Sequence, residues 1–87
     1  MRVAIIWREE SVYGRSVIDW LRELELRTGR TLESYEPDSP DGESLCRAYD
    51  VVEYPTILAI NDKGKLLQEW RGTMLPKIDD VNYYLIS

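Results

Sequence analysis

The chain has 87 residues, of which 44% are hydrophobic and 31% charged, and its formal net charge at pH 7 is −5. This length predicts a single domain, residues 1–87, with a small core. The acidic balance excludes a general nucleic-acid binder, which needs a basic stripe to neutralise phosphates. No apolar run approaches the roughly 20 residues of a membrane span, and the apolar start meets charged residues too soon for a signal peptide. We therefore expect a cytoplasmic protein that does not act at a membrane.

Catalytic and metal-binding chemistry is limited by two residue counts, because the sequence has no histidine and only one cysteine, Cys46. Ser-His-Asp and Cys-His catalytic pairs are excluded, as are a Cys/His zinc site within one chain and an intramolecular disulfide. The acidic residues lack the spacing of a calcium-binding loop, which leaves only an irregular carboxylate site open for Mg²⁺ or Ca²⁺. We expect no cofactor.

The first segment, Val3–Trp7, is an unbroken apolar run rich in β-branched residues, which is typical of a strand buried on both faces. A polar turn follows from Arg8 to Gly14. From about Arg15 the apolar residues recur at helical spacing, and Gly29 is placed to end the helix. The apolar stripe of this predicted helix consists of Val17, Ile18, Trp20, Leu21 and Leu24.

The middle of the chain predicts a second strand over Thr31–Tyr35, a loop over Glu36–Gly42 and a short helix over Glu43–Tyr49. Asp41 or Ser39 would cap this helix. Its inward residues would be Leu45, Cys46 and Tyr49. We interpret Cys46 as a small buried hydrophobe, with a redox-sensing thiol or an intermolecular disulfide as the alternative.

The last third predicts a strand over Thr56–Ile60, a hairpin turn over Asn61–Gly64 and a returning strand over Leu66–Arg71 at or near a sheet edge. Pro76 is placed to open a final helix. Its apolar face would hold Ile78, Val81 and Leu85. The predicted order is β-α-β-α-β-β-α, with a parallel first pair of strands because β-α-β units cross over right-handedly.

An acidic stretch runs from Glu33 to Glu53, with seven acidic residues against one basic residue, Arg47. Such a stretch is typical of a solvated acidic face. The alternative is a docking patch for a basic partner.

Several motifs in the second half resemble the thioredoxin-like family. They are the Tyr-x-Val of Tyr49–Val51, Pro55-Thr56 at a strand start, the turn Asn61–Lys65, and Trp70-Arg71-Gly72, with Ile6-Trp7 where many thioredoxins have Phe-Trp. The resemblance implies an α/β, thioredoxin-like fold with a four-stranded mixed sheet flanked by helices. It also implies a cis peptide bond between Tyr54 and Pro55.

The residues that carry out the redox chemistry of the family are absent from this sequence. Ser11-Val12-Tyr13-Gly14 occupies the positions of the Cys-x-x-Cys motif, and Ile5 stands where many thioredoxins hold a buried Asp. Serine forms no disulfide, and its hydroxyl needs a base to act as a nucleophile. We therefore expect a redox-inactive protein without dithiol oxidoreductase activity and with no catalytic residues.

The family's substrate groove can persist without its thiols. By resemblance its residues here are Trp7, Ser11, Val12, Tyr13, Gly14, Tyr54, Pro55, Thr73 and Met74. We expect this groove, beside Pro55, to bind a protein or an extended peptide, which could pair with the backbone of Tyr54. The alternative is that Trp7 belongs to the core, that Tyr13 and Tyr54 only shield the turn, and that the groove is empty.

A second functional class is a glutaredoxin-like protein that uses glutathione, or a monothiol redox protein in which Ser11 or Cys46 takes part. Arg8 could replace the basic residue that glutaredoxins place before the active-site turn, and Tyr54 could supply the backbone contact. The Gly-Gly-x-Asp-Asp-like helix start is reduced to Gly72, with Asp79 and Asp80 several residues later, so we do not expect glutathione binding. A third hypothesis is a structural domain of a larger complex.

Overall fold

The computed structural model describes residues 1–86, and all seven predicted elements are present in the predicted order. They are β1 (Arg2–Ile6), α1 (Gly14–Thr28), β2 (Glu33–Tyr35), α2 (Pro40–Tyr49), β3 (Thr56–Ile60), β4 (Leu66–Arg71) and α3 (Ile78–Leu85). The α/β class and the mixed sheet predicted from the sequence are therefore confirmed.

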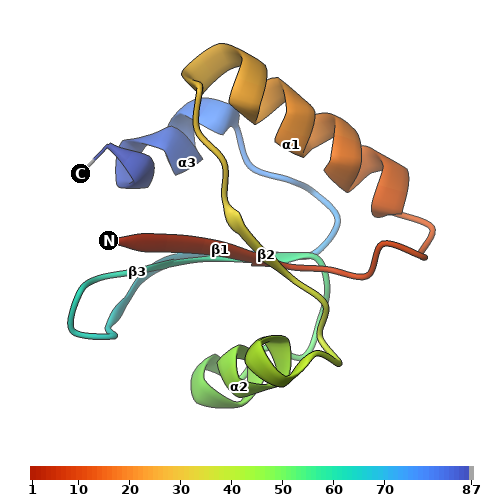
Figure 1. The fold of residues 1–87 in the computed structure, drawn as a ribbon, viewed down its shortest axis with the longest axis vertical. Coiled ribbons are helices and arrows are strands. Elements are labelled where there is room, and N and C mark those ends of the chain that lie inside the picture. Colours follow the sequence, from red (N-terminus) through yellow and green to blue (C-terminus); the bar gives the residue numbers. More distant parts are fainter. Residues whose placement is uncertain (87) are drawn as a thin grey trace.

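The four strands form one sheet in the order β2-β1-β3-β4. β1 and β2 are parallel, whereas β1–β3 and β3–β4 are antiparallel. Ile6 pairs with both Tyr35 and Thr56, and Thr56 pairs with Arg71. The ends of β1, β2 and β4 and the start of β3 therefore lie at one end of the sheet, which we call the loop end. In Figure 1 the loops that lead from β1 to α1, from β2 to α2 and from β4 to α3 leave the sheet at this end, and the loop from α2 enters β3 there.

Helices cover both faces of the sheet, with α1 and α3 on one side and α2 on the other (Figure 1). Because successive side chains of a strand point to opposite faces, β1 contributes to two cores. Val3, Ile5 and Trp7 join the α1/α3 core, and Ala4 and Ile6 join the α2 core. The unbroken apolar run of β1 is thus explained by burial on both faces.

The predicted helix boundaries differ from the structure at α2. This helix begins at Pro40, three residues before the predicted start at Glu43. Ser39 is the N-cap, and its hydroxyl oxygen accepts a hydrogen bond from the Gly42 N–H at 3.0 Å. Since this cap satisfies a backbone donor of the first turn, the helix incorporates residues that composition alone assigned to a loop.

Smaller differences occur at the other elements. β1 lies one residue earlier than predicted, and β2 spans only Glu33–Tyr35 rather than Thr31–Tyr35. α1 spans Gly14–Thr28 and is terminated, as predicted, by Gly29, its C-cap, which adopts a left-handed conformation with φ of 72°. β3 and β4 have the predicted bounds, and β4 is an edge strand.

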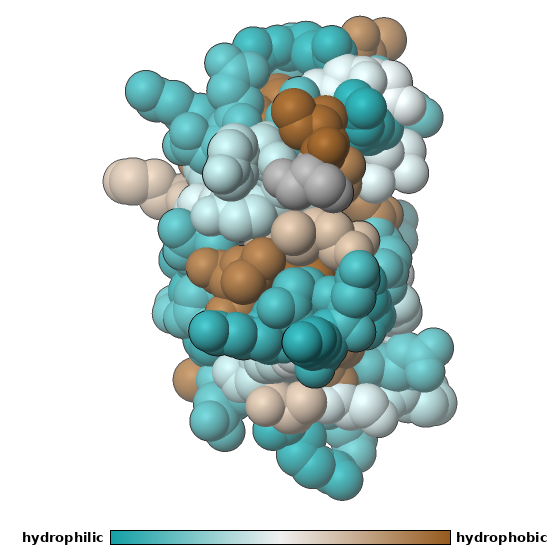
Figure 2. Space-filling view, turned by 90° about the vertical axis from the view of Figure 1, so that its left-hand side faces the viewer, coloured by the Kyte–Doolittle hydropathy of each residue, from teal (hydrophilic) through white to brown (hydrophobic). Residues whose placement is uncertain are grey.

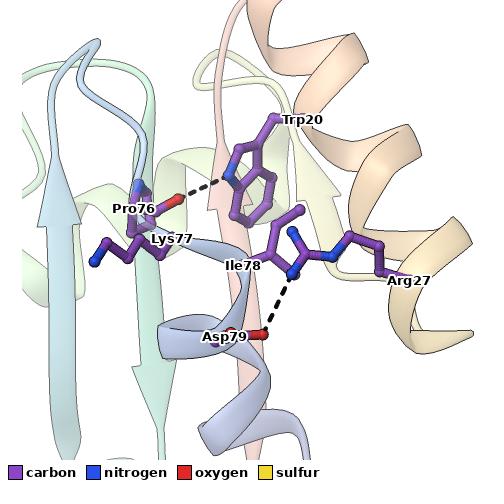
Figure 3. A pocket seen from close by; sticks show the side chains of 6 residues that line it. All are labelled: Trp20, Arg27, Pro76, Lys77, Ile78 and Asp79. Atoms are coloured by element: carbon purple, nitrogen blue, oxygen red, sulfur yellow. Dashed lines mark hydrogen bonds and ion pairs between the residues drawn. The ribbon is translucent and has the colours of Figure 1, made fainter.

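Pro76 does not open α3, because the helix begins two residues later with Lys77 as its N-cap. The Pro76 carbonyl instead accepts a hydrogen bond from Trp20 Nε1 at 2.9 Å. Nearby, Arg27 forms an ion pair with Asp79 at 3.6 Å. Figure 3 shows these two contacts across a shallow pocket between α1 and the start of α3. They fix the packing of α3 against α1.

The opposite end of the molecule carries the N-terminus, the C-terminal end of α3 and the β3–β4 turn (Figure 1). Figure 2 shows this end as largely hydrophilic, with apolar residues in separate small patches. No helix within residues 1–86 combines the length and apolar character needed to cross a bilayer.

Candidate functional site

The loop end brings together segments that are distant in the sequence. Arg8, just after β1, forms an ion pair with Asp38 in the β2–α2 loop at 2.6 Å. The Glu9 N–H donates to Glu36 Oε2 at 2.9 Å. On the other side of the sheet centre, the Gly72 N–H donates to the Pro55 carbonyl at 2.8 Å. These contacts join the four loops in two pairs, and the register of the strands places both pairs at the same end of the sheet.

The turn before α1, where the family motif would stand, is held by its own hydrogen bonds. The Arg8 N–H donates to the Tyr13 hydroxyl oxygen at 3.0 Å, and the Ser11 hydroxyl donates to the Arg8 carbonyl at 2.7 Å. The ring of Tyr13 packs against the α1/α3 core. Among residues 1–86 the Ser11 hydroxyl donates to this backbone carbonyl and to no side chain that could act as a base. Ser11 therefore stabilises the turn, and Tyr13 supports the turn from inside.

The Tyr54–Pro55 peptide bond is cis, and the Pro55 ring is buried. Tyr54 is half-buried, with its ring packed against the α2 core and its hydroxyl oxygen 4.0 Å from Cys46 Sγ. The Arg8 guanidinium lies 5.5 Å from the centre of the Tyr54 ring. Burial, and then the contact with Cys46, raises the pKa of Tyr54 above its usual value. Within residues 1–86 the backbone N–H and C=O of Tyr54 have no hydrogen-bond partner.

The predicted groove residues separate into surface and interior. Trp7 is only 8% exposed, and its Nε1 donates to Ser34 Oγ at 2.7 Å. Including Trp7 in the groove was therefore wrong, because the residue belongs to the core, as the alternative reading had it. Gly14 and Pro55 are also buried, and Ser11, Tyr13 and Tyr54 are half-buried. The exposed members are Val12, Thr73 and Met74.

The most accessible apolar side chains of the loop end are Val12, which is fully exposed, Met74 at 91% and Val52 at 84%. Val52 is not among the groove residues predicted from the sequence. A signal was present in the pair Val51-Val52 after α2, since neighbouring residues of an extended segment point in opposite directions. Val51 is buried in the α2 core, which turns Val52 outward.

Cys46 is half-buried on α2 and packs against the α2 core beside Tyr54. It is the only cysteine of the chain, so the chain cannot form a dithiol. Among residues 1–86 no group of three or more cysteine, aspartate or glutamate side chains is arranged to hold a metal ion.

Arginines donate hydrogen bonds to several carboxylates, and three of these pairs are Glu33 with Arg2, Asp38 with Arg8 and Glu69 with Arg71. In each pair the arginine lowers the pKa of the carboxyl group. Arg71 also donates to the carbonyl oxygens of Tyr49 and Asp50 at 3.0 and 2.8 Å, which fastens the end of α2 to β4.

These lowered pKa values predict an acid dependence of stability. A carboxyl whose pKa is lower in the folded chain stabilises the fold fully above its unfolded pKa of about 4. That contribution is lost as the pH falls through the folded value. Urea unfolding should therefore give a constant midpoint between about pH 7 and 5 and a falling midpoint below about pH 4. Glu33→Gln should reduce this fall, whereas Glu25→Gln, which removes an exposed carboxylate that has no arginine partner within the described residues, should leave it unchanged. Equal pH profiles for all three proteins would contradict the prediction.

A parallel β-α-β unit followed by an antiparallel hairpin and a last helix, with helices on both faces, is the thioredoxin-like fold. Comparison with solved structures shows the same class. Thioredoxin 1 from Thermosipho africanus TCF52B is similar over 99% of this chain and 91% of its own, with a TM-score of 0.63 and 13% identity.

Two further structures give the same result. A chain of the complex of ferredoxin:thioredoxin reductase with thioredoxin f2 matches 97% of this chain and 73% of its own, with a TM-score of 0.63 and 15% identity. A thioredoxin from Thermus thermophilus matches 97% of this chain and 70% of its own, with a TM-score of 0.58 and 17% identity. No protein-family model and no curated protein matches the sequence. The protein thus has a thioredoxin-like fold without a Cys-x-x-Cys motif.

Proposed function

We propose that this protein is a non-catalytic thioredoxin-fold module that binds a protein segment in extended conformation at the loop end. The observation that carries the proposal is the exposure of three apolar side chains, Val12, Val52 and Met74, on loops that meet at this end. Single exposed apolar residues are common on protein surfaces, but a group of them at one site indicates an interaction surface.

The backbone of Tyr54 supports the same proposal. Its N–H and C=O point to no partner among residues 1–86, although the neighbouring Pro55 carbonyl is bonded to Gly72. An extended peptide satisfies such free backbone groups by strand addition, and its side chains then contact the apolar residues on either side. Methionine adapts its shape to different partners, which suits Met74 to this role.

The glutathione-linked alternative is less well supported by the contacts of its key residues. Arg8, which would have to bind the tripeptide's carboxylate, is already paired with Asp38 and lies over the Tyr54 ring. The Ser11 hydroxyl is committed to the Arg8 carbonyl. Cys46 is half-buried on α2, with its Sγ 4.0 Å from the Tyr54 hydroxyl oxygen, so its thiol does not lie on the turn before α1.

The proposal is tested by selecting binders from a displayed library of random peptides and measuring the affinity of the selected peptides. Val12→Ser combined with Met74→Ser should weaken binding about tenfold or more, because two exposed apolar contacts are removed from the interface. Neither side chain contributes to the core, so the thermal midpoint should stay within about 3 °C of the parent value.

The matched control is Leu26→Ser combined with Ile86→Ser, which removes two exposed apolar side chains elsewhere. This control should bind the peptides as the parent does. Equal losses in the two double variants would contradict a site at the loop end. Amide shifts of Arg8 and Tyr54 on titration with glutathione, together with a failure to select any peptide, would favour the glutathione-linked alternative.

A further inference from the structure

We propose that the segment bound at the loop end is basic as well as apolar, with lysine or arginine residues flanking the side chain that contacts Val12 and Met74. This inference rests on the proposed function and specifies the partner of the same surface. It follows from how the charges around the exposed apolar residues are distributed between paired and unpaired groups.

The carboxylates at the loop end are largely unpaired. Glu9 and Glu10 precede Val12 in the turn before α1, and Glu36 contributes from the β2–α2 loop to the same shallow depression, which is also lined by Arg8. Glu53 lies on the other side, next to Gly72, where a Cβ would be 3.5 Å from its Oε2. Within the described residues none of these four carboxylates has an ion-pair partner.

The arginines near this end, in contrast, are already neutralised. The pairs are Arg8 with Asp38 at 2.6 Å, Arg15 with Asp19 at 3.5 Å and Arg71 with Glu69 at 2.7 Å. The apolar residues are therefore flanked by four unpaired carboxylates and by no unpaired arginine. The β4–α3 loop carries a single charged side chain, Lys77, which follows Met74 by three residues and has no ion-pair partner within the described residues, so the unpaired charge remains predominantly negative. The two acidic flanks come from segments that the sequence separates by more than forty residues, Glu9-Glu10 and Glu53, and only the sheet register brings them to one end.

Charge complementarity then selects the partner. A basic segment approaching this end is attracted from both flanks, whereas an acidic segment is repelled, which affects both association rate and specificity. Arg8 does not reverse this preference, because Asp38 cancels its charge locally and the Tyr54 ring holds its guanidinium in place.

The test uses labelled peptides of equal length with a central Leu-Val pair, flanked by lysine and arginine, by serine and threonine, or by aspartate and glutamate. A fourth peptide keeps the basic flanks and replaces the central pair with glycine. We expect the basic–apolar peptide to bind about tenfold more tightly than the neutral one and the acidic one to bind most weakly. This preference should shrink as salt rises from about 50 to 500 mM. The glycine peptide should lose most of its affinity.

The charge variant is Glu9→Gln with Glu10→Gln, and its control is Glu23→Gln with Glu25→Gln, two exposed positions of α1. Both change the net charge equally. Only the first should weaken binding of the basic–apolar peptide, by about three- to tenfold, with the affinity for the neutral peptide unchanged.

Three outcomes would each overturn the inference: equal effects of the two variants, equal affinities for the three apolar peptides, or full binding of the glycine peptide. If all three apolar peptides bind equally and the Val12→Ser/Met74→Ser variant binds none of them, the charge preference is overturned but the proposed function stands. Absence of any peptide binding would overturn the proposed function itself.

Discussion

Leu58→Ala is expected to remove a large part of the protein's stability. Leu58 is at the centre of β3, its side chain is 0% exposed, and it packs in the α2 core. Truncating a buried leucine costs about 2–5 kcal/mol, because it loses burial and leaves a cavity. A domain of this size has an unfolding free energy on the order of 5–10 kcal/mol. The thermal midpoint should therefore fall by at least about 10 °C, as followed by circular dichroism.

The matched control is Leu26→Ala, since Leu26 is 76% exposed on α1. The same substitution at this exposed position leaves no cavity, and alanine is at least as good a helix former as leucine. The unfolding free energy should change by less than about 0.5 kcal/mol. Similar losses for Leu58→Ala and Leu26→Ala would mean that the α2 core is not packed as described.

Gly42→Ala is expected to be destabilising even though alanine favours helices. In solvent, replacing glycine by alanine inside a helix stabilises it by about 0.5–1 kcal/mol. Gly42 is buried in the first turn of α2, where a Cβ would overlap the Glu36 carbonyl oxygen and lie 2.8 Å from Ser39 Oγ. The clash involves backbone, so relief requires the β2–α2 loop to move. We expect a net loss of about 1–3 kcal/mol in urea unfolding.

Ser44→Ala is the control for this prediction, because Ser44 is exposed on the same helix and its replacement should be neutral or slightly stabilising. The loop that Gly42 positions carries Glu36 and Asp38, which contact Glu9 and Arg8. Gly42→Ala should therefore also shift the amide resonances of Arg8 and Glu9 in the folded protein. A stabilised Gly42→Ala variant with unchanged resonances would contradict the close packing of this loop.

The candidate site was predictable only in part from the sequence. Spacing and the family resemblance placed Val12, Tyr54 and Met74 in loops that meet, and the sheet register brings those loops together. The sequence did not predict which aromatic residues face solvent. Trp7 is buried, where its Nε1 donates a hydrogen bond to Ser34 Oγ. The Tyr13 ring lies beneath the turn before α1, where its hydroxyl oxygen accepts a hydrogen bond from the Arg8 N–H. Partners of this kind are visible only in three dimensions.

The sequence by itself determined the elements and their order, because apolar periodicity, glycine stops and turn residues are local signals. It also determined that no dithiol forms, since one cysteine cannot pair with itself. Tertiary structure decided the burial of Trp7, whose Nε1 donates to Ser34 in β2, and the charge state of the surface. Arg8 and Asp38 are thirty residues apart in sequence, and their contact in the fold leaves the neighbouring Glu9, Glu10 and Glu36 without an ion-pair partner among the described residues. Ion pairs and side-chain burial depend on which distant segments meet, and only the fold decides that.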